Sequence, residues 1–161
     1  MDLYPWMVLV HIVAAFAFVM AHGVSVYAIY RVRRERDRAR LGALVDLSGS
    51  TLGFAGISLL VILVAGILAG VNQGFFAKAW IWSSIVLLVV VGGAMTPLAG
   101  SPMNKVRRAL GIAIRGDKEP PAAASDAELE ALLGSLRPEL PAAVGGVGLI
   151  VMVALMSLKP F

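Results

Sequence analysis

The chain has 161 residues, of which 59% are hydrophobic and 15% are charged, and its formal net charge is +4. Soluble domains contain about 45–50% apolar and about 25% charged residues, and a chain this short cannot hide such a surplus in a water-soluble core. The composition predicts a single integral membrane domain over residues 1–161, and the absence of cysteine excludes disulfides and thiolate chemistry.

The first apolar segment covers residues 5–30, which are 26 positions without a Lys, Arg, Asp or Glu. About 20 apolar residues in a helix cross a hydrocarbon layer of about 30 Å. A cleavable signal peptide has positive charge before its apolar run, whereas here Asp2 precedes the run and arginines follow it. We therefore expect a membrane-spanning helix.

The segment Arg31–Arg40 follows directly and contains six arginines. Basic residues beside an apolar span are typical of topology signals and of contact with anionic lipid, and we expect no nucleic-acid binding here. The sequence predicts that the helix continues out of the membrane and that the chain turns near Ser48–Gly49–Ser50.

Three further apolar segments predict spans at about residues 51–71, 79–99 and 141–158. Gly66 and Gly70 form a GxxxG motif, which lets helix backbones approach closely in lipid. The prolines and glycine from Pro97 to Pro102 are expected to end the third span. The predicted fold class is all-α: a bundle of four transmembrane helices with antiparallel neighbours.

The polar segment 100–139 is expected to contain two short amphipathic helices. Ser101 and Pro102 predict the start of the first, whose basic residues suit a helix lying on an anionic membrane surface. Ser125 and Glu128 form a capping box that predicts the start of the second.

The distribution of charge predicts the orientation. Twelve of the fourteen Lys and Arg residues lie in segments 31–50 and 100–139, and Lys78 and Lys159 are the other two. Loops rich in Lys and Arg stay in the cytoplasm. We expect a multi-pass protein of the bacterial inner (plasma) membrane, with these two segments in the cytoplasm and both termini outside.

The candidate site consists of the two histidines, His11 and His22, which both lie in the first span. Eleven residues are close to three helical turns, so the two side chains share one helix face, about 16.5 Å apart along the axis. Polar groups at membrane depth usually face the interior of the bundle and indicate function.

Three interpretations of this site remain open. In the first, His11 and His22 bind a b-type haem. The second axial ligand is a methionine from another span or a residue of a second copy, or the haem has no second ligand. Counted along the spans, Met95 lies at the same membrane depth as His22, and Met152 or Met156 lies near the depth of His11. In the second, each imidazole makes a hydrogen bond to a backbone carbonyl or a hydroxyl of another helix. In the third, His and Met residues handle copper or another metal.

The sequence shows no nucleophile paired with a base, no phosphate-binding loop and no paired buried carboxylates, so no catalytic residue is predicted. The alternative to a haem-binding or redox-associated function is a non-enzymatic accessory or scaffold subunit. Such a subunit binds lipid and a membrane protein partner or a second copy of itself.

Two segments of the chain resemble known membrane proteins: Leu9–Gly23, which has an early His in an apolar first span, and Trp80–Val90. In these the chain resembles small bacterial four-helix membrane proteins related to the copper-resistance D domain and the membrane protoporphyrinogen oxidase family. The resemblance implies a four-span layout, with haem or copper ligands in more than one span. This chain departs from that pattern, because spans two to four contain no His, Lys, Asp or Glu.

Overall fold

The computed structural model describes residues 2–160, and all regular structure in that range is helical. Its elements are α1 (Tyr4–Arg34), α2 (Arg38–Asn72), the 3-10 turn η1 (Phe75–Ala77), α3 (Ala79–Met95), the π-helical turn η2 (Thr96–Gly100), α4 (Ser101–Ala109), α5 (Asp126–Ser135) and α6 (Glu139–Leu158). The predicted all-α, four-helix architecture is confirmed.

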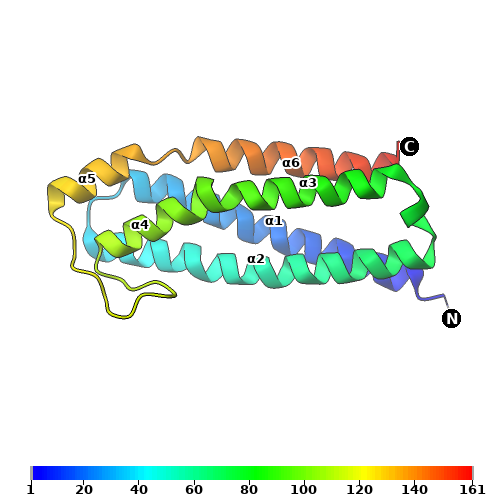
Figure 1. The fold of residues 1–161 in the computed structure, drawn as a ribbon, viewed down its shortest axis with the longest axis horizontal. Helices are drawn as coiled ribbons and strands as arrows, with labels where there is room; N and C mark the ends of the chain where they lie inside the picture. Colours follow the sequence, from blue (N-terminus) through cyan, green and yellow to red (C-terminus); the bar gives the residue numbers. More distant parts are fainter. Residues whose placement is uncertain (1, 161) are drawn as a thin grey trace.

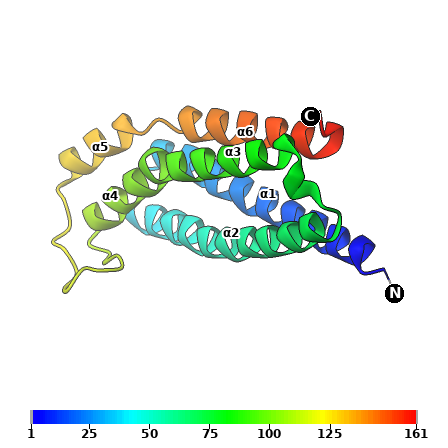
Figure 2. The same cartoon turned by 45° about the vertical axis from the view of Figure 1, so that its right-hand side comes forward.

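The long helices run antiparallel along one axis, as Figures 1 and 2 show. Helix α1 lies against α2, and α3 lies beside α6. Both ends of the chain lie at one end of the bundle, and α4, α5 and the loop between them form the other end. We call this second end, made of residues 31–47 and 101–139, the polar cap.

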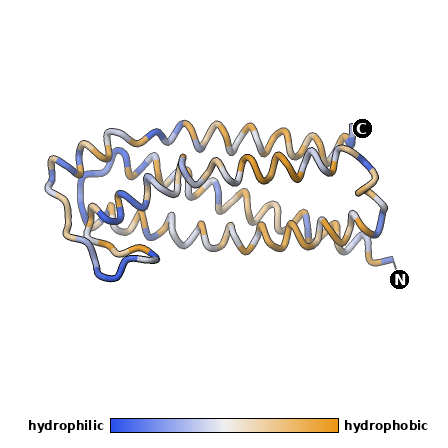
Figure 3. The backbone as a smooth tube through the Cα atoms, in the orientation of Figure 1, coloured by the Kyte–Doolittle hydropathy of each residue, from blue (hydrophilic) through white to orange (hydrophobic). Residues whose placement is uncertain are grey.

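Four helical stretches are long and apolar enough to cross a membrane, with 31, 35, 31 and 33 residues. A helix of 31 residues is about 46 Å long, whereas the hydrocarbon layer measures about 30 Å. The ends of the bundle therefore extend into water. Figure 3 shows this division, with hydrophobic residues along the middle of the bundle and hydrophilic residues gathered mainly in the polar cap.

Most large apolar side chains of the spans point outward, with Trp80 and Ile81 of α3 as buried exceptions, and small ones point inward. Phe16 is 68% exposed and Ile57 is 66% exposed. The buried face of α1 contains Ala14, Ala21 and Ala28, spaced by seven residues. This is the reverse of a soluble bundle, because in lipid the close approach of small residues joins helices. The chain is a multi-pass helical membrane protein.

The predicted turn near Ser48–Gly49–Ser50 is wrong, because the chain turns between α1 and α2, at residues 35–37. The carboxylate of Asp37 caps α2 by accepting a hydrogen bond from the Arg40 N–H at 2.8 Å. Glu35 accepts from the N–H groups of Asp37 and Arg36, which hold the pKa of its carboxyl below the ordinary value. Ser50 stays inside α2, where its hydroxyl donates to the Leu47 carbonyl.

The prolines of the third span do not end it, which corrects the second boundary prediction. The chain passes from α3 through η2 directly into α4. The wider π-helical turn takes up Pro97, which has no N–H to donate. The apolar side of the next helix packs against the protein, because Met103 and Val106 of α4 are buried.

The main hydrophobic core of the described residues lies in the polar cap, and Ile29 of α1 joins it from just outside the cap. It joins both ends of the α1–α2 turn to α4 and α5, and its members are Ile29, Val32, Leu41, Val45, Met103, Val106, Leu129, Leu133 and Leu136. Burial of large aliphatic residues gives a hydrophobic gain only where it removes them from water, and most charged residues of the chain lie in this part of it. The core and the charges around it together fit a cap that faces water.

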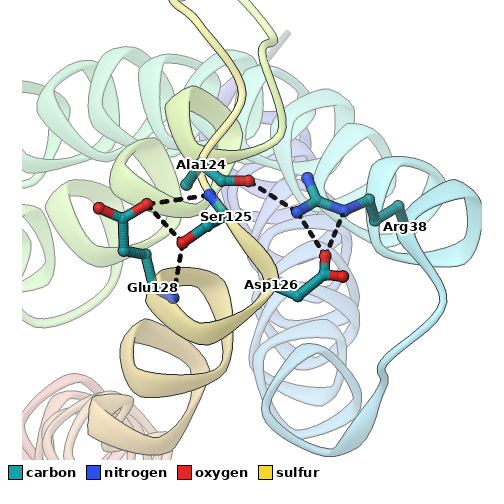
Figure 4. A network of polar contacts seen from close by, with 5 residues as sticks. All are labelled: Arg38, Ala124, Ser125, Asp126 and Glu128. Atoms are coloured by element: carbon teal, nitrogen blue, oxygen red, sulfur yellow. Dashed lines mark hydrogen bonds and ion pairs between the residues drawn. The ribbon is translucent and has the colours of Figure 1, made fainter.

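The predicted capping box at the start of α5 is confirmed. The Ser125 hydroxyl accepts from the Glu128 N–H at 3.3 Å, and the Glu128 carboxylate accepts from the Ser125 N–H at 2.9 Å. The Ser125 hydroxyl also donates to the Glu128 carboxylate, and these bonds hold the pKa of Glu128 below its ordinary value. Figure 4 shows Arg38 beside the box, where it bonds Asp126 and the Ala124 carbonyl, both at 2.7 Å.

Two further ion pairs tie α4 to its surroundings. Arg107 lies 2.5 Å from Asp46 and also donates to the Val45 carbonyl, so it joins α4 to α2. Arg108 pairs with Asp117 at 2.5 Å and holds the pKa of that carboxyl below its ordinary value. The second pair holds the loop between α4 and α5 against α4.

Candidate functional site

His11 lies at the contact between α1 and α2. Its Nδ1 donates to the Ile62 carbonyl at 2.8 Å. Gly66, one turn further along α2, makes room for the ring, because a Cβ added there would lie 3.1 Å from His11 Cε1 and Nδ1. This arrangement leaves Nε2 of His11 as the ring nitrogen with a free lone pair.

A second polar contact fixes the register of the same two helices. The hydroxyls of Ser25 and Ser48 lie 3.2 Å apart. The 14 residues from His11 to Ser25 on α1 match the 14 residues from Ser48 to Ile62 on α2. The His11–Ile62 and Ser25–Ser48 contacts therefore belong to one continuous antiparallel register of α1 and α2. Both are polar contacts that hold the two helices in this register.

His22 lies at the contact between α1 and α6. Its ring stacks on Phe18, with centroids 6.2 Å apart and an interplanar angle of 6°. Its Nε2 lies directly against Gly145, so that a Cβ added to Gly145 would overlap this nitrogen. Only a glycine allows α6 to approach the imidazole so closely at this position.

Met95 and Met152 are both half-buried, on α3 and α6. Gly148 of α6 packs on Val91 of α3, so Met95 lies close to the depth of Gly145 and hence of His22. Counting 11 residues from Gly145 puts Met156, rather than Met152, level with His11. The structure thus places His11 against α2 and His22 against α6. The two histidines lie at different depths along the bundle axis.

Among residues 2–160, no three His, Cys, Asp or Glu side chains gather as a metal centre would require. Within the same range, every deeply buried side-chain nitrogen or oxygen has a hydrogen-bond partner. No orphaned polar atom in the described part of the chain therefore points to a missing ligand.

Sequence reasoning missed the partners of the two histidines: the Ile62 carbonyl, Gly66 and Gly145. A backbone carbonyl leaves no trace in the sequence, so the first could not be found. The GxxxG motif at Gly66 and the glycines of the fourth span did signal close helix packing. They did not show that a histidine side chain occupies the space.

No protein-family model, curated protein or solved structure matches the chain. What can be said of its function therefore comes from its own residues.

Proposed function

We propose that this protein is a non-enzymatic accessory or scaffold subunit of the inner (plasma) membrane. The observation that carries the proposal is the use of both histidines in contacts between helices. His11 is bonded to the Ile62 carbonyl of α2, and His22 is packed against Gly145 of α6. Side chains that join helices have a structural role that needs no bound group.

The outward faces of the spans support the proposal that a partner binds within the membrane. In the apolar spans of α2 and α3, four glycines have nothing within 4 Å of the position of an added Cβ: Gly53, Gly56, Gly92 and Gly93. Exposed glycines leave flat strips along α2 and α3, against which a helix of a partner or of a second copy can pack closely.

The proposed orientation has the polar cap in the cytoplasm and both termini outside. Its support is the charge distribution, because 12 of the 14 Lys and Arg residues belong to the cap and the loops beside it. The ion-paired cap then offers the cytoplasmic surface of the subunit.

A b-type haem at His11 is the second candidate function, in line with the resemblance to four-helix haem and copper proteins. A ligating histidine usually donates its other ring N–H to a carbonyl or carboxylate, and His11 donates Nδ1–H to Ile62. The free Nε2 fits an axial ligand. His22 fits less well, because the α6 backbone at Gly145 lies against its Nε2. When bound, haem would supply electron-transfer or oxygen chemistry.

The two candidates are separated by two variants at one position, His11→Asn and His11→Ala. An asparagine amide nitrogen takes the place of Nδ1 and keeps the hydrogen bond, but it cannot ligate iron as Nε2 does. For a scaffold, we expect His11→Asn to unfold like the wild type in detergent. His11→Ala should lose about 0.6–1.7 kcal/mol, the value of such bonds in membranes.

The visible spectrum of the same preparations, made with ample haem, completes the test. The scaffold proposal predicts a colourless wild-type protein. A Soret band that disappears in both His11→Asn and His11→Ala would overturn it in favour of haem.

A further inference from the structure

An open hollow lies where α1 leaves the membrane, and it is lined by Tyr30, Arg33, Arg34 and Arg36. Tyr30 is the last residue of the uncharged run that begins at Pro5. A tyrosine at the end of a span lies at the level of the lipid headgroups. The hollow therefore combines three guanidinium groups and a phenol at the depth of lipid phosphates.

The protein's own bonds arrange two of these arginines. Arg33 pairs with Glu139 at 3.5 Å, and Arg36 lies 3.8 Å from Glu130. The Arg36 guanidinium also donates to the Arg33 and Glu35 carbonyls, at 3.1 and 2.9 Å. These donors cover carbonyls at the end of α1, where the helix dipole would otherwise repel an anion.

Arg34 differs from its neighbours. Its side chain makes no hydrogen bond or ion pair within residues 2–160, although it is exposed at the rim of the same hollow. The nearby carboxylate of Glu35 is already bound by the N–H groups of Arg36 and Asp37. The hollow thus keeps a positive charge that the protein does not neutralise.

We propose that this hollow binds the phosphate group of one anionic phospholipid of the cytoplasmic leaflet. Guanidinium groups bind phosphate oxygens through two parallel hydrogen bonds, and the Tyr30 hydroxyl supplies a further donor. Arg34 is the residue whose charge the phosphate neutralises. The inference goes beyond the scaffold proposal, because it holds whether or not the protein binds haem or a partner, and only the choice of leaflet rests on the proposed orientation.

The test is native mass spectrometry of the full chain in detergent, titrated with phosphatidylglycerol or phosphatidylcholine. We expect one tightly retained phosphatidylglycerol and weaker retention of phosphatidylcholine. Arg34→Gln should weaken phosphatidylglycerol binding about tenfold, the effect of losing one hydrogen-bonded charge. Because Arg34 has no protein partner, this variant should fold normally, which thermal unfolding will check.

The control is Arg115→Gln, which removes the same charge from an exposed position of the loop between α4 and α5. It should leave the affinity unchanged. An equal loss in both variants would mean general attraction of charge and would overturn the site. Displacement of the lipid by excess inorganic phosphate would also overturn it, because the hollow would then be a site for free phosphate.

Discussion

Replacing Leu133 with alanine is expected to lower the free energy of unfolding of the polar cap by about 2–5 kcal/mol. Leu133 of α5 is 1% exposed and lies in the core between α1, α2, α4 and α5. The change removes buried methyl groups and leaves a cavity where rigid helices cannot close in. Hydrogen exchange of α5 and of the first turns of α2, measured in detergent, will report the loss.

Leu132→Ala is the matched control, because Leu132 precedes Leu133 in the same helix but is only partly buried. Leu132→Ala should lower the free energy of unfolding of the polar cap clearly less than Leu133→Ala does. Equal exchange in the two variants would contradict the assignment of the cap as a packed, water-facing unit.

The second large effect is expected for Gly145→Leu, which should destabilise the bundle by about 1–3 kcal/mol, as overpacking of a tight contact does. Any side chain at this position meets His22 Nε2. Gly146→Leu is the control, since nothing lies within 4 Å of its added Cβ. Both variants gain the same helix propensity over glycine, so the difference in their unfolding free energy isolates the contact.

The double variant His22→Ala with Gly145→Leu tests whether the His22 side chain is the group that a side chain at position 145 meets. Removing the imidazole should restore much of the stability, which appears as a coupling energy between the two positions. Additive losses in the double variant would show that His22 does not occupy the space beside Gly145.

The four spans could be predicted because each depends only on the length and hydropathy of one segment. The capping box of Ser125 could be predicted for the same reason, because it joins two residues only three positions apart in the sequence. The first turn was misplaced because Ser48–Ser50 has the composition of a turn, whereas the decisive interaction is the cap by Asp37. Pro97 has the properties of a helix terminator, whereas its place within a π-helical turn depends on the helices around it.

The candidate site was only half predictable. That His11 and His22 share one face follows from helical periodicity, and the structure keeps both in contact with other helices. Which helix each one meets depends on how the spans are arranged, and hydropathy does not encode that. For the same reason the sequence did not show that α4 and α5 complete a core with the α1–α2 turn.

We propose that the polar cap faces the cytoplasm while both ends of the chain lie outside. The most direct measurement uses a reporter that is active only outside the cytoplasm, fused after Gly116 in one version and at the carboxyl end in another. Gly116 lies in the exposed loop between α4 and α5. We expect no activity after Gly116 and full activity at the carboxyl end. Activity after Gly116 would contradict it.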